Sequence, residues 1–538
     1  MLKVFFDCQI FQTEAFNRGM GKYSLSLLTE LFKSKQYKSK HQTVFVFNKN
    51  LPLLKDSLKQ IQSINKEAAI VEVDLPIKPV GDTQKKYLNA SKQLDEILKA
   101  NLRPSEESVF ILLAPFFVDF VSAFPTIKNI RKISIIYDII PQLIWKKQRI
   151  FPDELYFNHY RLFREADKLL TISESVRQDL IHLVGVAEDK IKTIDGGPFN
   201  KAGITRHKKE NNYILFPSAP IVHKNNINAV RGFDEFNKLN GNKYKLIITS
   251  NFDEKSKSDL EKLSSNLYFT GNVSNVELAG FYQGCNAVLF ASLCEGLGMP
   301  VLESVNYTKP VACSDIAVLK EISSKGFYFF NPLSPKSIAN ALTLAVNRRG
   351  WKEKLSNYEK IGNKYTWKRT AQIFAKEMKE KSANVNNKPK INIRCPDPHV
   401  ESGVAKLIEK IYFSLARYYE LSIIYKKAWR RSSPSYIPYI SQNTKMDRPT
   451  IFITNSLRKP TAYFRPNKDT HIAVVNKIQT LLSFTNSHKP DFTLFSKKKI
   501  YNNVLRINEW VYSDKESEKE FSIKNSPLSK ILKNIIRN

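Results

Sequence analysis

Two glutamates, Glu295 and Glu303, stand eight positions apart in the stretch ASLCEGLGMPVLESVNYTKPVACSD. Gly296 and Gly298 between them permit a tight turn and a close approach of backbone. Pro300 suits the first turn of a helix, whose N-terminal end offers N–H groups and a positive dipole end to a phosphate. Carboxylates on either side of such a place can accept hydrogen bonds from sugar hydroxyls. The pattern predicts a site for a diphosphate with a sugar at each end, which describes a nucleotide sugar.

A structural alternative exists for these two glutamates. Glu295 can cap the helix, and Glu303 can be a solvated acid in its first turn. The glycines and the proline between them favour the binding site over this alternative.

The elements around the glutamates indicate parallel sheets. The apolar run NAVLFAS leads into the first glutamate, and KPVACSD follows the helix. Comparable runs recur at LKVFFD, ESVFILLA, KISIIYDII, YILFPS and YKLIITS, alternating with helical segments such as KYSLSLLTELFK. Such runs suit strands buried on both faces. The alternation predicts an α/β chain of doubly wound, Rossmann-like domains that bind ligands at the carboxyl ends of their strands.

The charge of the chain points to an anionic partner. Lys and Arg number 84 against 51 Asp and Glu, a formal net charge of +33. Nucleic acid, an acidic membrane face and phosphate-bearing ligands all fit this excess, and a compositional bias of the genome explains it equally well. Five scattered cysteines without a C-x-x-C pair indicate reduced, intracellular thiols. Neither a signal peptide nor a long apolar run is evident, so we expect a cytoplasmic protein whose membrane contact, if any, is peripheral.

The run from Gly271 to Asp315 closely resembles the signature of the family-four retaining glycosyltransferases. These enzymes have the GT-B fold, in which two Rossmann-like domains face a cleft. Glu295 and Glu303 reproduce the family's spacing of a Glu, seven residues and a second Glu. The resemblance implies that Glu295 contacts the donor sugar and that Glu303 binds the ribose of the nucleotide. The donor-binding segment between them, expected to face the diphosphate, contains Gly296, Leu297 and Gly298.

Two further segments resemble the same family. RGMGKYSLSLL is similar to its first glycine loop, so Gly19 and Gly21 are expected to approach the cleft near phosphate or acceptor; an ordinary strand-to-helix turn is the alternative. FPSAPIVHKNNINAV is similar to the strand, loop and helix that carry a basic pair. Lys224 would neutralise the donor diphosphate through charge-assisted hydrogen bonds. His223 stands where many members have Arg and is assigned to donor binding.

IIYDIIP resembles a His-Asp-x-x-Pro segment at the end of a strand in the N-terminal domain. Asp138 fits this pattern and is predicted to be catalytic together with Glu295 and Lys224; a turn-capping Asp is the alternative. Tyr137 replaces a His that points to the donor sugar in relatives, and a phenol can still donate a hydrogen bond there. Because no D-x-D pair occurs, the resemblance predicts transfer without a metal or cofactor. Lys224 and the helix start at 298–300 would hold the diphosphate.

A third segment restarts the pattern. PDPHVESGVAKLIEK resembles the first strand, loop and helix of another GT-B N-terminal domain, but no second Glu-x7-Glu follows. The basic stretches KKAWRR and SKKKIYNN fit either an anionic membrane surface or a solvated face. The predicted parts are a Rossmann-like acceptor-side domain at 1–205, a Rossmann-like nucleotide-sugar-binding domain at 206–365, a crossover helix at 366–382, a linker at 383–390, a partial transferase-like accessory domain at 391–515 and a basic tail at 516–538.

The sequence thus predicts a retaining hexosyltransferase. It would move a sugar, with mannose as the first choice, from a GDP- or UDP-sugar to a growing cell-surface glycan of the O-antigen or capsule type, with a free or lipid-linked acceptor. One alternative is a catalytically weak relative that serves as a membrane-docked assembly subunit. A nucleic-acid binder rests on charge alone, and because no nucleic-acid-binding motif accompanies it we expect no such partner.

Overall fold

The computed structural model describes residues 2–52, 55–78, 83–103, 106–117, 119–127, 129–141, 162–163, 165–184, 186–199 and 212–380, and seven strands beyond them. Two compact units divide the chain. The first consists of Met1–Arg177 and Ile191–Ala383, and the second of Gln178–Lys190 and Asn384–Asn538.

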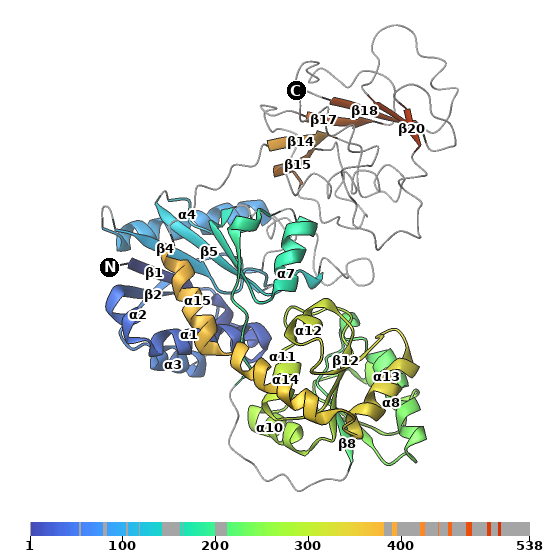
Figure 1. Ribbon diagram of the computed structural model, residues 1–538. Helices are drawn as coiled ribbons and strands as arrows, with labels where there is room; N and C mark the ends of the chain where they lie inside the picture. Colours follow the sequence, from blue (N-terminus) through green and yellow to red (C-terminus); the bar gives the residue numbers. More distant parts are fainter. Residues whose placement is uncertain are drawn as a thin grey trace. The chain divides into compact units, whose positions relative to one another are not determined.

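The first sheet of unit 1 is parallel, with the strand order β3-β2-β1-β4-β5-β6-β7 (Figure 1). Its strands are β1 (Leu2–Asp7), β2 (His41–Asn48), β3 (Ala69–Val73), β4 (Ser108–Leu112), β5 (Ile130–Ile136), β6 (Lys168–Thr171) and β7 (Ile191–Thr193). The helices along this part of the chain are α1 (Gly19–Lys33), α2 (Lys35–Lys40), α3 (Lys55–Ile64), α4 (Thr83–Asn101) and α7 (Glu174–Asp179), with shorter turns η1 (Gln9–Gln12), η2 (Glu14–Asn17), η3 (Leu180–Val184) and η4 (Glu188–Lys190).

Side chains of this sheet are buried on both faces, as the unbroken apolar runs predict. In β1, Val4 and Phe6 belong to the core shared with α1, where the ring of Phe6 meets that of Phe32 edge-on at 6.1 Å. Phe5, which points to the opposite face, is also fully buried. A strand with apolar side chains on both faces must be covered by helices on both sides, which is the arrangement of a doubly wound domain.

The second sheet of unit 1 has the order β10-β9-β8-β11-β12-β13 and is parallel as well. Its strands are β8 (Tyr213–Phe216), β9 (Lys245–Ile248), β10 (Leu267–Phe269), β11 (Ala287–Phe290), β12 (Val311–Ser314) and β13 (Tyr328–Phe330). The helices are η5 (Val222–Lys224), α8 (Asn226–Leu239), α9 (Glu254–Glu261), α10 (Asn275–Gly284), α11 (Met299–Asn306), α12 (Ala317–Ile322), α13 (Pro335–Val346), α14 (Trp351–Lys364) and α15 (Trp367–Lys379). A capping box of Ser274 and Glu277 closes the start of α10.

Helix α15 returns to the first sheet (Figure 1). At its start, Trp367 donates from Nε1 to the carbonyl of Pro198 at 2.8 Å and packs edge-on against Tyr23 of α1. Further along, the ring of Phe374 stacks on that of Phe6 in β1. The helix at the end of the second domain therefore becomes part of the core of the first.

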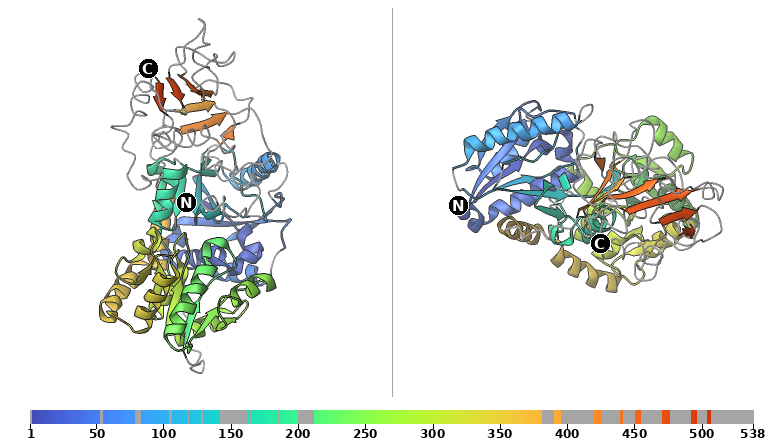
Figure 2. Two further views of the ribbon diagram at one scale, coloured as in Figure 1. Left: turned by 90° about the vertical axis from the view of Figure 1, so that its right-hand side faces the viewer. Right: turned by 90° about the horizontal axis from the view of Figure 1, so that it is seen from above.

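The second unit contains a third parallel sheet, visible in both views of Figure 2. Its strands are β14 (Lys390–Arg394), β15 (Glu420–Ile424), β16 (Tyr439–Ile440), β17 (Thr450–Thr454), β18 (Thr470–Val475), β19 (Phe492–Phe495) and β20 (Val504–Arg506). The order β16-β15-β14-β17-β18-β19-β20 repeats that of the first sheet strand for strand. This is the strand order of a doubly wound, Rossmann-like sheet. The bounds 391–515 and the partial character of this domain stay a prediction.

Several predictions fall outside the described residues. They are the boundary at 205/206, the linker up to residue 389, the stretches KKAWRR and SKKKIYNN, and the tail at 516–538. Within the described part of the chain, no helix combines the length and apolarity needed to cross a membrane.

Candidate active site

The loop between β11 and α11 carries the predicted donor residues. Gly298 precedes the helix with a φ of 92°, a left-handed conformation that favours glycine. Pro300 lies in the first turn of α11, where its lack of an N–H is tolerated. Glu295 comes before this turn and Glu303 one turn after it, so the two carboxylates flank the N-terminal end of α11 as the sequence predicts.

Lys224 and Glu295 form an ion pair across 71 residues of sequence. The Nζ of Lys224 donates to Oε1 of Glu295 at 2.6 Å, and the two side chains are 19% and 11% exposed. Two further hydrogen bonds fix the segment of Lys224 to the segment of Glu295. Leu293 N–H donates to the carbonyl of His223 at 2.7 Å, and Asn225 Nδ2 donates to the carbonyl of Ala291 at 3.1 Å. The structure therefore brings these two predicted catalytic residues together.

Asp138 belongs to the same electrostatic group, although it follows β5 of the first sheet. Burial raises the pKa of its carboxyl to about 6, and the negative charge of Glu295 raises it further. The N–H of Ile140, which donates to Oδ1 at 2.9 Å, and the positive charge of Lys224 both lower this pKa. The hydrogen bond from Ile140 is also what a turn-capping Asp makes. Asp138 thus caps its turn and lies within electrostatic reach of the ion pair.

The hydroxyl of Tyr137 is directed into the first domain. It donates to the carbonyl of Leu113 at 2.9 Å and lies 2.8 Å from Oγ of Ser24 on α1. The tyrosine is buried, and burial raises the pKa of its phenol. In this conformation the hydroxyl is engaged with α1 and the end of β4, so its predicted contact with a donor sugar would require another rotamer.

Gly296 touches the first domain through its backbone. Oγ of Ser173 donates to its carbonyl at 2.6 Å. A Cβ at this position would lie 2.2 Å from the carbonyl oxygen of Tyr137. The side chain of Leu297 is buried in the shared core, near Gly196. Any contact of Leu297 with a diphosphate would therefore come from its backbone.

Glu303 is held from two directions. Tyr282 of α10 donates from its hydroxyl to Oε2 at 2.7 Å. Burial raises the pKa of the Glu303 carboxyl to about 6, while the Tyr282 hydrogen bond and the positive charge of Lys22 oppose the rise. Lys22 belongs to α1 of the first domain, so both domains contribute to the surroundings of this carboxylate.

His223 is a buried, neutral imidazole. Burial and the neighbouring charge of Lys224 lower its pKa to about 4, with Glu295 opposing them. Its Nδ1 has no hydrogen-bond partner in the described part of the chain. Where a family arginine would bring a permanent charge, this chain has an uncharged group at neutral pH.

The two glycines of the first loop differ. A Cβ on Gly21 would lie 2.4 Å from the carbonyl oxygen of Ala15 and 2.5 Å from Cα of Phe16. A Cβ on Gly19 would meet nothing within 4 Å. Gly21 is thus required by its packing against η2, which agrees with the alternative that this segment is an ordinary strand-to-helix turn. Gly19 faces open space.

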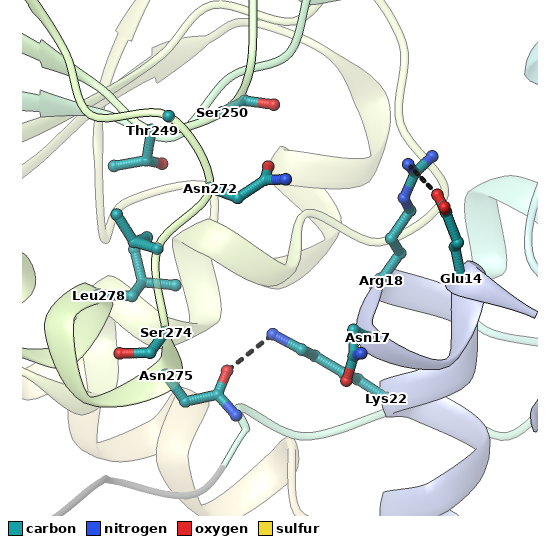
Figure 3. Close-up of a pocket in the computed structure, with 12 residues that line it drawn as sticks. Glu14, Asn17, Arg18, Lys22, Thr249, Ser250, Asn272, Ser274, Asn275 and Leu278 are labelled. Atoms are coloured by element: carbon teal, nitrogen blue, oxygen red, sulfur yellow. Dashed lines mark hydrogen bonds and ion pairs between the residues drawn. The ribbon is translucent and has the colours of Figure 1, made fainter. Parts of the chain in front are cut away.

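A cavity of about 770 Å³ opens between α1 and the second sheet (Figure 3). The first domain contributes Glu14, Asn17, Arg18 and Lys22, and the Nζ of Lys22 donates to Oδ1 of Asn275 at 2.8 Å. The second domain lines the cavity with Thr249, Ser250, Gly271, Asn272, Val273, Ser274, Asn275 and Leu278, which follow β9 and β10 or begin α10.

Lys22, Tyr282 and the two loops that line this cavity were not predicted from the sequence. Lys22 directly follows Gly21 of the glycine loop, so its place beside a predicted phosphate or acceptor site could have identified it as a ligand-binding cation. The loops follow strands, where ligands of doubly wound sheets bind. Nothing in the sequence indicated that the hydroxyl of Tyr282 is directed to Glu303.

Comparison with known proteins is consistent with this arrangement. The family described as Glycosyl transferases group 1 matches residues 200–364, which contain Lys224, Glu295 and Glu303. Residues 200–364 form a group 1 glycosyltransferase domain.

The serotype-specific mannosyltransferase WbdA of Escherichia coli is 20% identical over 404 residues, covering 69% of this chain and 47% of WbdA. The O-antigen chain mannosyltransferase RfbU of Salmonella typhimurium is 30% identical over 185 residues, covering 33% of this chain and 51% of RfbU. The chain spans about half the length of these relatives.

Solved structures show that the group 1 domain and the domain before it have the GT-B fold, as predicted. Sucrose-phosphate synthase of Thermosynechococcus elongatus superposes with a TM-score of 0.53 at 13% identity, covering 70% of this chain and 98% of that structure. HepE of Anabaena, solved in complex with UDP and glucose, gives a TM-score of 0.50 at 12% identity over 70% of this chain and 99% of its own.

Within the described residues, no group of three or more His, Cys, Asp and Glu side chains is arranged to hold a metal ion. Metal-independent transfer stays a prediction.

Proposed function

We propose that the protein is a retaining glycosyltransferase that moves a hexose from a nucleotide-sugar donor to a growing cell-surface glycan. The observation that carries the proposal is the Lys224–Glu295 pair beside the N-terminal end of α11. A cation, a helix N-terminus and a sugar-binding carboxylate are the groups that a departing nucleoside diphosphate and its sugar need.

Each residue has a role in this proposal. The Nζ of Lys224 and the N-terminal end of α11 stabilise the charge that develops on the diphosphate. Glu295, which Lys224 keeps in place, accepts hydrogen bonds from hydroxyls of the transferred sugar. Glu303 accepts them from the ribose, and the nucleoside end extends into the cavity lined by Asn272 and Asn275. Asp138 approaches the reaction centre from the first domain.

Mannose is the sugar we propose for the donor. Both WbdA and RfbU are named mannosyltransferases, and RfbU is named for the O-antigen chain. A lipid-linked or free glycan of this kind would be the acceptor, bound from the side of the first sheet.

A second candidate is a donor-binding relative with little turnover. Two observations favour it: the hydroxyl of Tyr137 is engaged with Leu113 and Ser24, and His223 is uncharged at neutral pH. Such a protein would bind the donor through Glu303 and Lys224 without transferring the sugar, and would serve in an assembly of polysaccharide-synthesis enzymes.

A thermal-shift screen of the full chain against GDP-, UDP-, dTDP- and CMP-sugars, without added metal, tests donor binding. A ligand at about 100 times its dissociation constant adds about 2.7 kcal/mol to the free energy of unfolding. We expect a shift from GDP-mannose that Lys224→Met removes. Release of GDP in the presence of a mannose-terminated acceptor then separates the two candidates. Absence of a shift from every nucleotide sugar would overturn both.

A further inference from the structure

The contact between Tyr282 and Glu303 joins two elements of the second domain. The hydroxyl of Tyr282 donates to Oε2 of Glu303 at 2.7 Å and lies 3.4 Å from the carbonyl of Pro300, in the first turn of α11. Tyr282 is 1% exposed, so bulk water cannot replace its hydroxyl. The phenol therefore contacts the start of α11 and the carboxylate one turn later.

Helix α10 holds this phenol in a fixed position. The Ser274–Glu277 capping box closes the N-terminal end of the helix, and the hydroxyl of Tyr213 donates to the carbonyl of Phe281 at 2.8 Å. The ring of Tyr282 stacks on that of Tyr307 with centroids 5.4 Å apart and planes 5° apart. A ring fixed in this way can hold the rotamer of the carboxylate that it contacts.

The hydrogen bond leaves one oxygen of Glu303 for a ligand. Tyr282 engages Oε2, and no other hydrogen bond to this carboxylate is found among the described residues. The groups that face Glu303 are Tyr282 of α10, Tyr307 of its own helix and Lys22 of α1. An acceptor oxygen held beside a cation and two phenols is suited to bind a hydroxyl.

We propose that Tyr282 is a positioning residue that orients the Glu303 carboxylate so that it accepts hydrogen bonds from the ribose of the donor. The inference rests on the proposed function, because it takes the ligand of Glu303 to be a nucleoside. Beyond the proposed function, the inference states that discrimination between ribose and deoxyribose depends on Tyr282, which does not touch the donor.

The state of the Glu303 carboxyl agrees with this role. Burial raises its pKa to about 6, which would leave part of it protonated just below neutral pH, and the Tyr282 hydrogen bond opposes that rise. A protonated carboxyl accepts hydrogen bonds less well than a carboxylate. By donating to Oε2, Tyr282 thus favours the form of Glu303 that binds hydroxyls.

Titration calorimetry of the full chain tests the proposal with GDP, UDP and their 2′-deoxy and 3′-deoxy analogues as probes. The wild type should prefer the ribonucleotide over at least one deoxy analogue by about tenfold or more, the size expected for a hydrogen bond to a charged group. Tyr282→Phe keeps the stacked ring and removes the hydroxyl. It should lose most of this preference and move the acid limb of ribonucleotide affinity to higher pH.

Tyr328→Phe is the matched control. Tyr328 is also buried in the second domain, and its hydroxyl donates to the carbonyl of Arg349 at 2.8 Å. This variant should keep the wild-type preference and the wild-type acid limb.

Two results overturn the inference in different ways. If Tyr282→Phe binds ribonucleotides and deoxynucleotides in the wild-type ratio, Tyr282 is structural and the proposed function stands. If the wild type binds none of these nucleotides, the proposed function fails and this inference fails with it.

Discussion

The ammonium group of Lys224 lies 2.6 Å from the carboxylate of Glu295, and both side chains are largely buried. The two residues were predicted separately, one for the diphosphate and the other for the sugar. Because they are paired, removal of either leaves the other as an uncompensated charge. Single substitutions here therefore combine a loss of chemistry with a loss of stability, and the two effects must be measured separately.

Glu295→Gln should abolish sugar transfer while the chain stays folded. The amide keeps the shape of the side chain but gives Lys224 no charged partner and binds sugar hydroxyls differently. Lys224→Met should lose about 2–4 kcal/mol of transition-state stabilisation, by analogy with a lost oxyanion donor. Donor turnover and circular dichroism are measured in parallel, and wild-type-like turnover in either variant would contradict the site assignment.

The stability effect of the same pair is accessible through a double-mutant cycle in urea. Each single variant should lower the free energy of unfolding by about 1–3 kcal/mol, since a buried charge loses its partner. The double variant should lose less than the sum, with a coupling of about 1 kcal/mol or more. The exposed pair Lys257–Glu254 is the control, and its coupling should stay below about 0.5 kcal/mol. Equal coupling in the two pairs would show that the Lys224–Glu295 contact is not formed in solution.

Gly19 and Gly21 provide a matched pair. Gly21→Ala forces a methyl group against the backbone of Ala15 and Phe16, which should lower the free energy of unfolding by about 1–3 kcal/mol. Gly19→Ala meets nothing within 4 Å and should leave stability unchanged or slightly higher. Urea denaturation separates the two. Loss of donor affinity in Gly19→Ala alone would support the predicted approach of a ligand at Gly19, whereas equal stability of both variants would contradict the packing role of Gly21.

The strands and the glutamate spacing were predictable because they depend on local pattern. LKVFFD coincides with β1, and the run before Glu295 contains β11, since strands buried on both faces must be apolar throughout. The turn at Gly298 and the start of α11 follow from glycine and proline geometry, which is likewise local.

Side-chain direction was not predictable because it depends on packing between distant elements. Tyr137 was expected at the donor sugar, but its hydroxyl is engaged with Ser24, 113 residues away in sequence. Tyr282 looks like an ordinary core residue of α10 in the sequence, and its function depends on where α11 places Glu303. Lys22 reaches Asn275 across 253 residues, a contact that follows only from how the two domains face each other.

His223 gives a pH dependence with a definite sign. Its pKa is lowered from 6.5 to about 4, so between these values the unfolded chain binds a proton that the folded chain does not. The free energy of unfolding contributed by His223 therefore falls as the pH falls through this window, by about 2 kcal/mol at pH 5. The raised pKa values of Asp138 and Glu303 act with the opposite sign, so the wild type alone does not isolate the effect.

The comparison with His223→Asn isolates it. The free energy of unfolding of the wild type, minus that of the variant, should decrease by about 2 kcal/mol when the pH is lowered from 7.5 to 5. A ring-proton resonance assigned to His223, absent from the variant, should titrate near pH 4. A resonance titrating near 6.5 would mean that the imidazole is solvated.

Gly296→Ala tests the contact between the two Rossmann-like domains. Its Cβ would lie 2.2 Å from the carbonyl oxygen of Tyr137, and backbone at the end of β5 cannot yield as a flexible side chain would. The two domains must then move apart at this point, displacing Asp138 from the Lys224–Glu295 pair. A displacement of about 1 Å can lower kcat/KM by about 100-fold. Nucleotide affinity should fall as well, because Lys22 of α1 contributes to the surroundings of Glu303 and lines the cavity assigned to the nucleoside. Gly362→Ala, within α14 and with nothing near its added Cβ, is the control and should raise stability by up to about 1 kcal/mol without affecting transfer. Donor affinity and kcat/KM are measured for both variants. Wild-type kcat/KM in Gly296→Ala would mean that transfer does not require the domain contact seen here.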